Sequence, residues 1–235
     1  MSIAEQVTQL KQDFDDVYGA GKQSGTDEMW DKLQDYGNRK DYRYAFFYTG
    51  FQYLDPKHTI NATHADSIMS NMSDLESVNW NKFNLSAVNS LYSAFAFCEK
   101  LTTIDTDLAV PNDSATLLNS VCRNCNSLTR IQKITAFPTA VWKNSFDYCT
   151  ALTHVIFDGT IGANGLDLHW STGLDKESIT SIINALSTTT SGLSITLSQT
   201  AVDNAFANDE ESVGSNTGEW AELIETKSNW TINLV

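Results

Sequence analysis

Basic residues are scarce in this chain of 235 residues, which has 15 Lys and Arg against 29 Asp and Glu and a formal net charge of -14. Clustered basic charge is what binds phosphate backbones, so the composition argues against a nucleic acid as partner. Long apolar runs are also missing, since none reaches the roughly 18 to 20 residues that span a bilayer. The first residues lack the basic and apolar regions of a signal peptide. We therefore expect no membrane insertion and no signal peptide.

Motifs of catalysis are absent as well. The sequence contains no H-E-x-x-H, no G-x-S-x-G and no glycine-rich phosphate loop, and none of its 4 histidines sits in a recognisable nucleophile and base pattern. The carboxylate pair of Asp105 with Asp107 is more typical of a solvated face than of acid/base catalysis. The acidic run at 209–211 lacks the alternating acidic loop that binds calcium. We predict that the protein is not an enzyme and has no metal or cofactor.

The first segment has the spacing of an amphipathic helix. Its apolar residues advance by four, three, four and three positions and form one stripe, Ile3, Val7, Leu10, Phe14 and Val17. The register ends there, after two and a half heptads, which is shorter than a firm coiled coil. The stripe therefore has two interpretations, self-association between copies of the chain or docking onto the chain's own body. A second short helix is predicted over residues 26–36, before Gly37.

An internal repeat dominates the middle of the chain. Apolar residues recur at every third position in the groups Met69, Met72, Leu75 and Val78; Phe95, Cys98, Leu101 and Ile104; Cys122, Cys125, Leu128 and Ile131; and Phe146, Cys149, Leu152 and Val155. The second member advances by 26, 27 and 24 residues, and the pairs Val110-Pro111 and Phe137-Pro138 also lie 27 apart. This spacing suits a tight turn that leads into a short strand. Each unit can bury its apolar row only against the next unit, so the pattern predicts a solenoid.

The units at residues 94–104 and 144–155 resemble the leucine-rich repeats of the BspA type, which read roughly A-F-x-x-C-x-x-L-x-x-I. The resemblance covers about residues 65–160 and departs from the pattern at Met69, Met72 and Cys122. A heptad-patterned start, a few repeats and the tail at 179–193 together are similar to repeat proteins encoded by phages and prophages of Gram-positive gut bacteria. The resemblance implies an α/β solenoid that recognises a surface, without identifying the ligand.

The tail predicts alternating helices and strands. Three groups have helical spacing: Ile179, Ile182, Ile183 and Leu186; Ala201, Val202, Ala205 and Phe206; and Trp220, Leu223 and Ile224. Two groups alternate as strands do: Leu193, Ile195 and Leu197; and residues 230–235. We interpret them as an α/β C-terminal cap that covers the open end of the solenoid.

The predicted organisation has four parts. These are a helical, coiled-coil-like segment at 1–37, an N-terminal cap at 38–64, a leucine-rich-repeat array at 65–160 and the C-terminal cap at 161–235. The aromatic-rich segment 41–63 has a second interpretation, an exposed binding patch. A cap is favoured because a contiguous exposed apolar patch of that size is rare.

The cysteines include a C-x-x-C pair, Cys122 and Cys125, which by itself suggests zinc or a disulfide. The repeat offers a different explanation. Cys98, Cys125 and Cys149 share one repeat position, and Met72 fills that position in the first unit. A position that accepts methionine favours apolar core residues over metal ligands. We expect buried free thiols.

Side chains that alternate with the core positions of the repeat strands should form an outward ladder across successive turns. The expected ladder is Ser77 and Asn79, Thr103 and Asp105, Arg130 and Gln132, and His154 and Ile156. Only 19% of the chain is charged, and neutral polar groups suit a glycan or a protein surface. For any single residue, solvation of the sheet face is the simpler explanation. The ladder as a whole is the predicted binding site.

Two functions of different classes follow from these patterns. In the first, the protein is a recognition component of a phage or prophage tail, whose amino-terminal helix assembles copies of the chain and whose repeats contact a host-surface protein or glycan. Val7 and Leu10 at heptad positions a and d favour a dimer, whereas the resemblance implies a trimer. In the second, it is a monomeric bacterial adhesin or interaction scaffold. The expected location is the virion or the cell surface.

Overall fold

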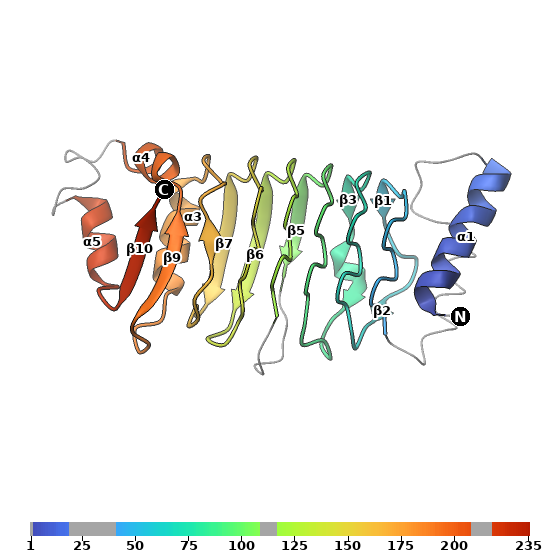
Figure 1. Ribbon diagram of the computed structural model, residues 1–235, viewed down its shortest axis with the longest axis horizontal. Coiled ribbons are helices and arrows are strands. Elements are labelled where there is room, and N and C mark those ends of the chain that lie inside the picture. Colours follow the sequence, from blue (N-terminus) through green and yellow to red (C-terminus); the bar gives the residue numbers. More distant parts are fainter. Residues whose placement is uncertain (1, 19–40, 109–116, 208–217) are drawn as a thin grey trace.

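The computed structural model describes residues 2–18, 41–108, 117–207 and 218–235, which form a parallel β-solenoid of about five turns (Figure 1). The turns follow one another along the long axis, with the amino-terminal helix at one end and the carboxyl-terminal strands at the other. The predicted solenoid is confirmed. It arises because units with the same spacing of apolar residues stack in register.

The elements of the described residues are, in chain order, α1 (Ile3–Tyr18), β1 (Tyr53–Leu54), β2 (Ile60–Asn61), β3 (Ser77–Val78), the 3₁₀ helix η2 (Trp80–Lys82), β4 (Phe83–Asn84), β5 (Thr103–Asp107), β6 (Arg130–Ala136), β7 (His154–Gly159), β8 (Asp167–Leu168), α3 (Lys176–Ala185), β9 (Leu193–Leu197), α4 (Gln199–Ala205), α5 (Glu219–Glu225) and β10 (Trp230–Leu234). The strands form the sheets β1-β3, β2-β4, β5-β6-β7 and β10-β9-β8, in which every pair is parallel. Each turn thus returns the chain to the same face in the same direction.

A tight turn precedes each of the strands β1, β3, β5, β6 and β7. Every turn holds two residues in the left-handed region, four positions apart and with φ between 52° and 62°, in the pairs Tyr44 and Tyr48, Ser67 and Asn71, Ser93 and Phe97, Ser120 and Asn124, and Asn144 and Tyr148. Backbone amides of one turn donate to carbonyls of the next, as Phe97 does to Arg123 at 2.7 Å. These bonds satisfy the polar backbone and hold successive turns in register.

The repeat positions form the core. Apart from Val78, which is partly buried, every repeat residue recognised in the sequence is at most 1% exposed. Equivalent side chains such as Phe95 and Phe146 lie inside the coil of the chain, where each unit covers its neighbour. The apolar row therefore contributes its burial energy only when the units are stacked.

Residues 41–63, for which the sequence favours a cap over an exposed patch, form a further turn of the solenoid. Leu54 of β1 pairs with Val78 of β3, and Asp41 bridges to His64. Phe46 is fully buried, whereas Tyr48 is 71% exposed. This turn therefore buries one set of aromatic rings and displays another.

The repeat register also extends past residue 160. Leu168, Ser171 and Leu174 keep the three-residue spacing and are at most 2% exposed. The Ser171 hydroxyl donates to the Cys149 carbonyl at 3.1 Å, and Cys149 Sγ makes the corresponding bond to the Cys122 carbonyl at 3.0 Å. Serine in place of cysteine concealed this turn from the sequence pattern.

Helix α3 takes the place of a strand beside β7. Its N-cap Asp175 accepts a hydrogen bond from the Ser178 amide. The Ser178 hydroxyl accepts from the Val155 amide at 2.9 Å, and the Ser181 hydroxyl accepts from the Phe157 amide at 3.1 Å. Two hydroxyls of a helix thus satisfy amides that another strand would otherwise bind, and the edge of the central sheet is occupied.

The rest of the tail contains the helices and strands that its spacing predicts. β8, β9 and β10 form one sheet, and α4 and α5 lie at the same end of the molecule (Figure 1). The buried Lys227 ammonium donates to the carbonyls of Asn184 and Leu186 at 3.0 and 2.6 Å, at the C-terminal end of α3. Burial lowers the pKa of this ammonium. The acidic run at 209–211 and the residues around Val110 lie outside the described ranges.

Helix α1 lies beside the first turn (Figure 1). Ile3 and Val7 are 4% and 0% exposed and belong to the hydrophobic core, and Leu10 packs against it. The part of the stripe that the structure describes is therefore docked on the chain's own body. The side chains of Phe14 and Val17, and the helix predicted at 26–36, lie outside the described part of the chain.

Candidate binding surfaces

The ladder residues predicted from the sequence lie on β3, β5, β6 and β7 or directly beside them, and none of them is buried. Thr103, Arg130 and His154 occupy one register position on three adjacent strands. Ser77 opposes Tyr53 in the preceding pair, β1 with β3. Register shifts interrupt both pairings of the central sheet just beyond this row, at the place of Asp105, Gln132 and Ile156. The structure therefore aligns the first row of the ladder and staggers the second.

His154 is held in position at the end of the aligned row. Its Nδ1 lies 2.8 Å from Asp175 Oδ2. Burial alone would raise the pKa of the Asp175 carboxyl, but hydrogen bonds from Ser178 and His154 outweigh burial and lower it. Arg130, the middle residue of the row, makes no side-chain hydrogen bond or ion pair with any residue in the described ranges. Its guanidinium is therefore free to bind a partner.

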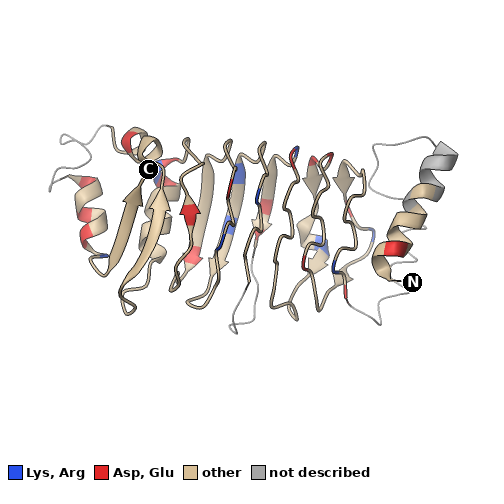
Figure 2. Ribbon diagram, in the orientation of Figure 1, with Lys and Arg blue, Asp and Glu red and all other residues tan. Residues whose placement is uncertain are grey.

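The acidic residues next to the row have partners within the chain. Lys133 Nζ lies 2.9 Å from Asp107 and 3.6 Å from Asp158, so it links β5, β6 and β7. The hydrogen bond to Asp107 raises the pKa of this ammonium and keeps it charged. Asp105 accepts a hydrogen bond from the Thr103 hydroxyl at 3.0 Å. Figure 2 shows that most residues along the ribbon of the solenoid are uncharged.

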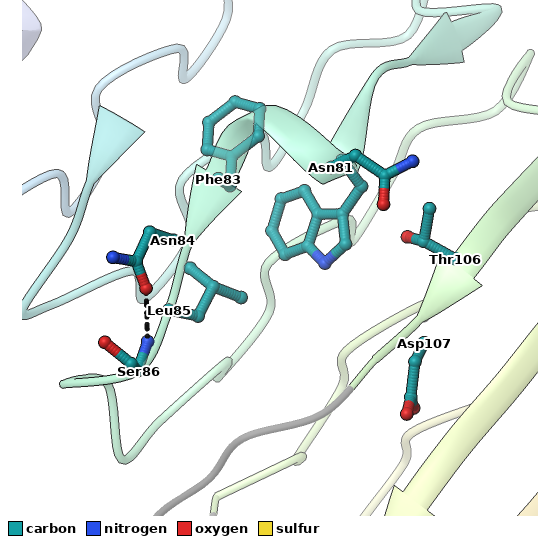
Figure 3. Close-up of a pocket in the computed structure, with 8 residues that line it drawn as sticks. Asn81, Phe83, Asn84, Leu85, Ser86, Thr106 and Asp107 are labelled. Carbon is teal, nitrogen blue, oxygen red and sulfur yellow. Dashed lines mark hydrogen bonds between the residues drawn. The ribbon is translucent and has the colours of Figure 1, made fainter. Parts of the chain in front are cut away.

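A cleft of about 290 Å³ lies beside this face (Figure 3). Trp80 and Phe83 stack within it, with ring centroids 4.9 Å apart and planes inclined by 27°. Thr106 Oγ1 is buried there and has no hydrogen-bond partner among the described residues. The cleft is completed by Asn81, Asn84, Leu85, Ser86 and Asp107. No repeat position predicts this cleft, and its only signal in the sequence is the pair of aromatic residues between the first and second repeat groups.

The cysteines are buried and unpaired, as the repeat register predicts. Cys98 Sγ donates to the Met69 carbonyl at 3.1 Å, and Cys125 Sγ donates to the Phe95 carbonyl at 3.0 Å. Burial raises the pKa of the Cys98 thiol well above its ordinary value. The thiolate is the nucleophilic form of cysteine, so the raised pKa disfavours reactivity of this thiol. Within the described ranges, no three metal-binding side chains of the His, Cys, Asp or Glu type come together.

No family model, curated protein or solved structure matches this chain. The fold itself places the protein among parallel β-solenoids. Of the helices in the described residues, none has the length and apolarity needed to cross a membrane. Its function is therefore inferred from the surfaces of the solenoid.

Proposed function

We propose that the protein is a non-enzymatic recognition module with BspA-like leucine-rich repeats, and that its strand face contacts a protein or glycan on a host surface. We further propose that it is a component of a phage or prophage tail. The observation that carries the proposal is the row of Thr103, Arg130 and His154 on three adjacent strands. Extended faces of this kind are what repeat proteins use for binding.

The chain's end elements support the same function. Helix α3 occupies the edge of the central sheet through Ser178 and Ser181, so we propose that the tail is an α/β cap. A capped array exposes its faces to partners without exposing an open sheet edge that would aggregate. The repeat spacing of residues 65–160 supports the leucine-rich-repeat assignment.

A monomeric adhesin or interaction scaffold is the second candidate. The observation that favours it is the burial of Ile3 and Val7 against the chain's own body. These residues begin the stripe that would join copies of the chain in a tail assembly. If the whole stripe is docked in this way, it is not available to a second copy.

Light scattering on a sizing column separates these two candidates. We expect a dimer or trimer for the full chain and a monomer for a chain that starts at Asp41, if the helix assembles the protein. Circular dichroism of the shortened chain would show that its solenoid stays folded. A monomer in both cases would contradict assembly through the helix and support the scaffold.

Binding to whole Gram-positive gut bacteria, measured by flow cytometry, tests the recognition face. The double variant Arg130→Ala with His154→Ala should lose binding, because it removes the free guanidinium and the end of the aligned row. Lys100→Ala is the matched control, since this exposed lysine pairs with Asp74 outside the row. Equal binding by the double variant and the control would contradict a role for the strand face.

A further inference from the structure

A second surface follows the tight turns. The second left-handed residue of each turn occupies the same place in the repeat, and register places Trp170 at the same position in the turn of Leu168 and Ser171. The residues at this position, here named the turn-edge row, are Tyr48, Asn71, Phe97, Asn124, Tyr148 and Trp170. Aromatic rings and asparagine amides alternate along this row until its last two residues, which are both aromatic.

Backbone bonds show that the row is continuous. The amides of Tyr48, Asn71, Phe97 and Asn124 each donate to a carbonyl of the following turn, at 3.4, 2.8, 2.7 and 2.8 Å. At the end of the row, the rings of Tyr148 and Trp170 lie 4.5 Å apart between centroids, with planes inclined by 31°. Neighbouring turns are thus hydrogen-bonded along the row, and its last two rings are in contact.

The aromatic side chains of the row are accessible. Tyr48 and Tyr148 are 71% and 41% exposed, whereas Phe46 and Phe146, two positions earlier, are fully buried. Phe97 and Trp170 are half-buried. The row therefore presents ring faces or edges to solvent while the adjacent aromatic residues form the core.

The backbone does not require aromatic residues at these positions. A bulky residue at positive φ is unusual, and asparagine is one of the few residues that adopts this conformation readily. Asn71 and Asn124 fill the position in two of the turns. Because the same turn is built with asparagine, the rings of Tyr48, Phe97 and Tyr148 call for an explanation outside the fold.

The spacing of the row indicates the kind of ligand. Neighbouring turns of a parallel sheet lie about 4.8 Å apart, so the rings on alternate turns are about 10 Å apart, roughly the length of two sugars in an extended β-linked chain. Flat rings stack on the apolar faces of sugars, and an amide between them can both donate to and accept from hydroxyls. The alternation of rings and amides fits such a chain.

The charges beside the row indicate that the ligand is neutral. Arg123 Nε lies 3.9 Å from Asp147 Oδ2, so these two charges beside the row oppose each other. The Asp167 carboxylate has a partner as well, since its Oδ1 lies 2.7 Å from His169 Nδ1. The whole chain has a formal net charge of -14, which disfavours anionic polymers. We propose that the turn-edge row binds an extended, neutral, β-linked polysaccharide that runs along the solenoid. This inference rests on the proposed recognition function but assigns it a second surface and a ligand class.

Affinity electrophoresis of the full chain in gels containing hydroxyethyl cellulose tests this proposal. We expect the polymer to retard the protein, and dextran, an α-linked polymer, to leave its mobility unchanged. Phe97→Asn and Tyr148→Asn should each raise the dissociation constant about tenfold. Asparagine is chosen because the fold already carries it at this position, and circular dichroism would show that the variants are folded. Tyr92→Asn is the control, since Tyr92 is also exposed, at 45%, but lies outside the row.

Absence of retardation of the full chain, or equal retardation of the row variants, would overturn the inference. A second result would also overturn the inference: the row variants keep both cell and polymer binding, while the Arg130 and His154 double variant loses cell binding. That result would leave the proposed function supported. Retardation that depends on the row, without any binding to cells, would support the inference and contradict the proposed function. Cell binding that needs Phe97 but is not competed by the polymer would indicate a protein ligand and overturn it.

Discussion

Non-glycine residues in the left-handed region are the most unusual single residues of this protein. Tyr48, Phe97 and Tyr148 have φ of 57°, 62° and 60°. For a residue with a large side chain, this conformation costs about 1 to 2 kcal/mol relative to the right-handed region. The cost is tolerated because the turn's backbone bonds to its neighbours over-determine the conformation. The aromatic rings of the surface row therefore stand at positions where the backbone conformation lowers the stability of the protein.

We predict that Tyr48→Asn stabilises the protein. Asparagine adopts the left-handed conformation more easily, so the free energy of unfolding should rise by about 0.5 to 1 kcal/mol. Urea unfolding followed by circular dichroism measures the change, with Tyr92→Asn as a control at an exposed position outside the left-handed region. A decrease for Tyr48→Asn would show that packing of Tyr48 on Phe47, with ring centroids 4.4 Å apart, outweighs the backbone cost.

The buried thiols predict a dependence of stability on pH. Burial raises the pKa of Cys98 in the folded protein, whereas an unfolded thiol ionises near about pH 8.5. The folded state therefore holds its proton while the unfolded state loses it, so the stability contributed by the thiol is present below about pH 8.5 and declines as pH rises above it. Urea midpoints measured between pH 7 and about pH 10 should fall less steeply for Cys98→Ala. Equal slopes for the two proteins would contradict this assignment.

A helix supplies hydrogen-bond acceptors to a strand in this protein. β7 has a strand, β6, on one side and a helix, α3, on the other. Serine hydroxyls of α3 replace the carbonyls that a further strand would supply to the amides of Val155 and Phe157. A helix can therefore follow the last long strand without leaving buried donors unpaired.

We predict that Ser178→Ala destabilises the protein by about 1 to 3 kcal/mol, because the buried Val155 amide loses its acceptor. Urea unfolding provides the measurement. Thr180→Ala, on the same helix and half-buried, is the matched control and should change stability by less than about 0.5 kcal/mol. Equal effects of the two substitutions would show that helix propensity, rather than the bond to β7, accounts for the loss.

The whole molecule is a line of units with different ends. At the amino-terminal end, α1 adds Ile3 and Val7 to the same hydrophobic core that runs through the repeats. At the other end, β8, β9 and β10 continue parallel pairing in a separate sheet. Stability in such a line depends on contacts between neighbours, so loss of an end element should be felt first in the adjacent turn.

We predict that Val7→Ala lowers the free energy of unfolding by about 1 to 2 kcal/mol. The substitution should also increase the rate of amide hydrogen exchange more in residues 41–54 than in β6. Val7 is fully buried in the single chain, which is why its truncation should leave a cavity. Thr8→Ala, at an exposed neighbouring position, is the control. A change in solution mass without a change in exchange would show instead that Val7 faces a second copy.

Periodicity alone predicted the central array because repeat units are local. Apolar residues three apart in Phe95, Cys98 and Leu101 specify a turn and its buried side within one unit. The same logic identified the outward position of Arg130 and the buried thiols. It failed at the ends, because Thr49 and Ser171 fill the buried position that holds cysteine in the array.

The sequence by itself determined the solenoid, its core rows and the strands that carry the ladder, since these depend on spacing along the chain. Only the tertiary structure decided which surface residues align. The register shifts that stagger Asp105 and Gln132, the cleft at Trp80 and the stack of Tyr148 on Trp170 depend on how one turn is placed against another. The sequence also left the partner of Val7 undecided. An apolar stripe predicts burial, but it does not specify which surface covers it.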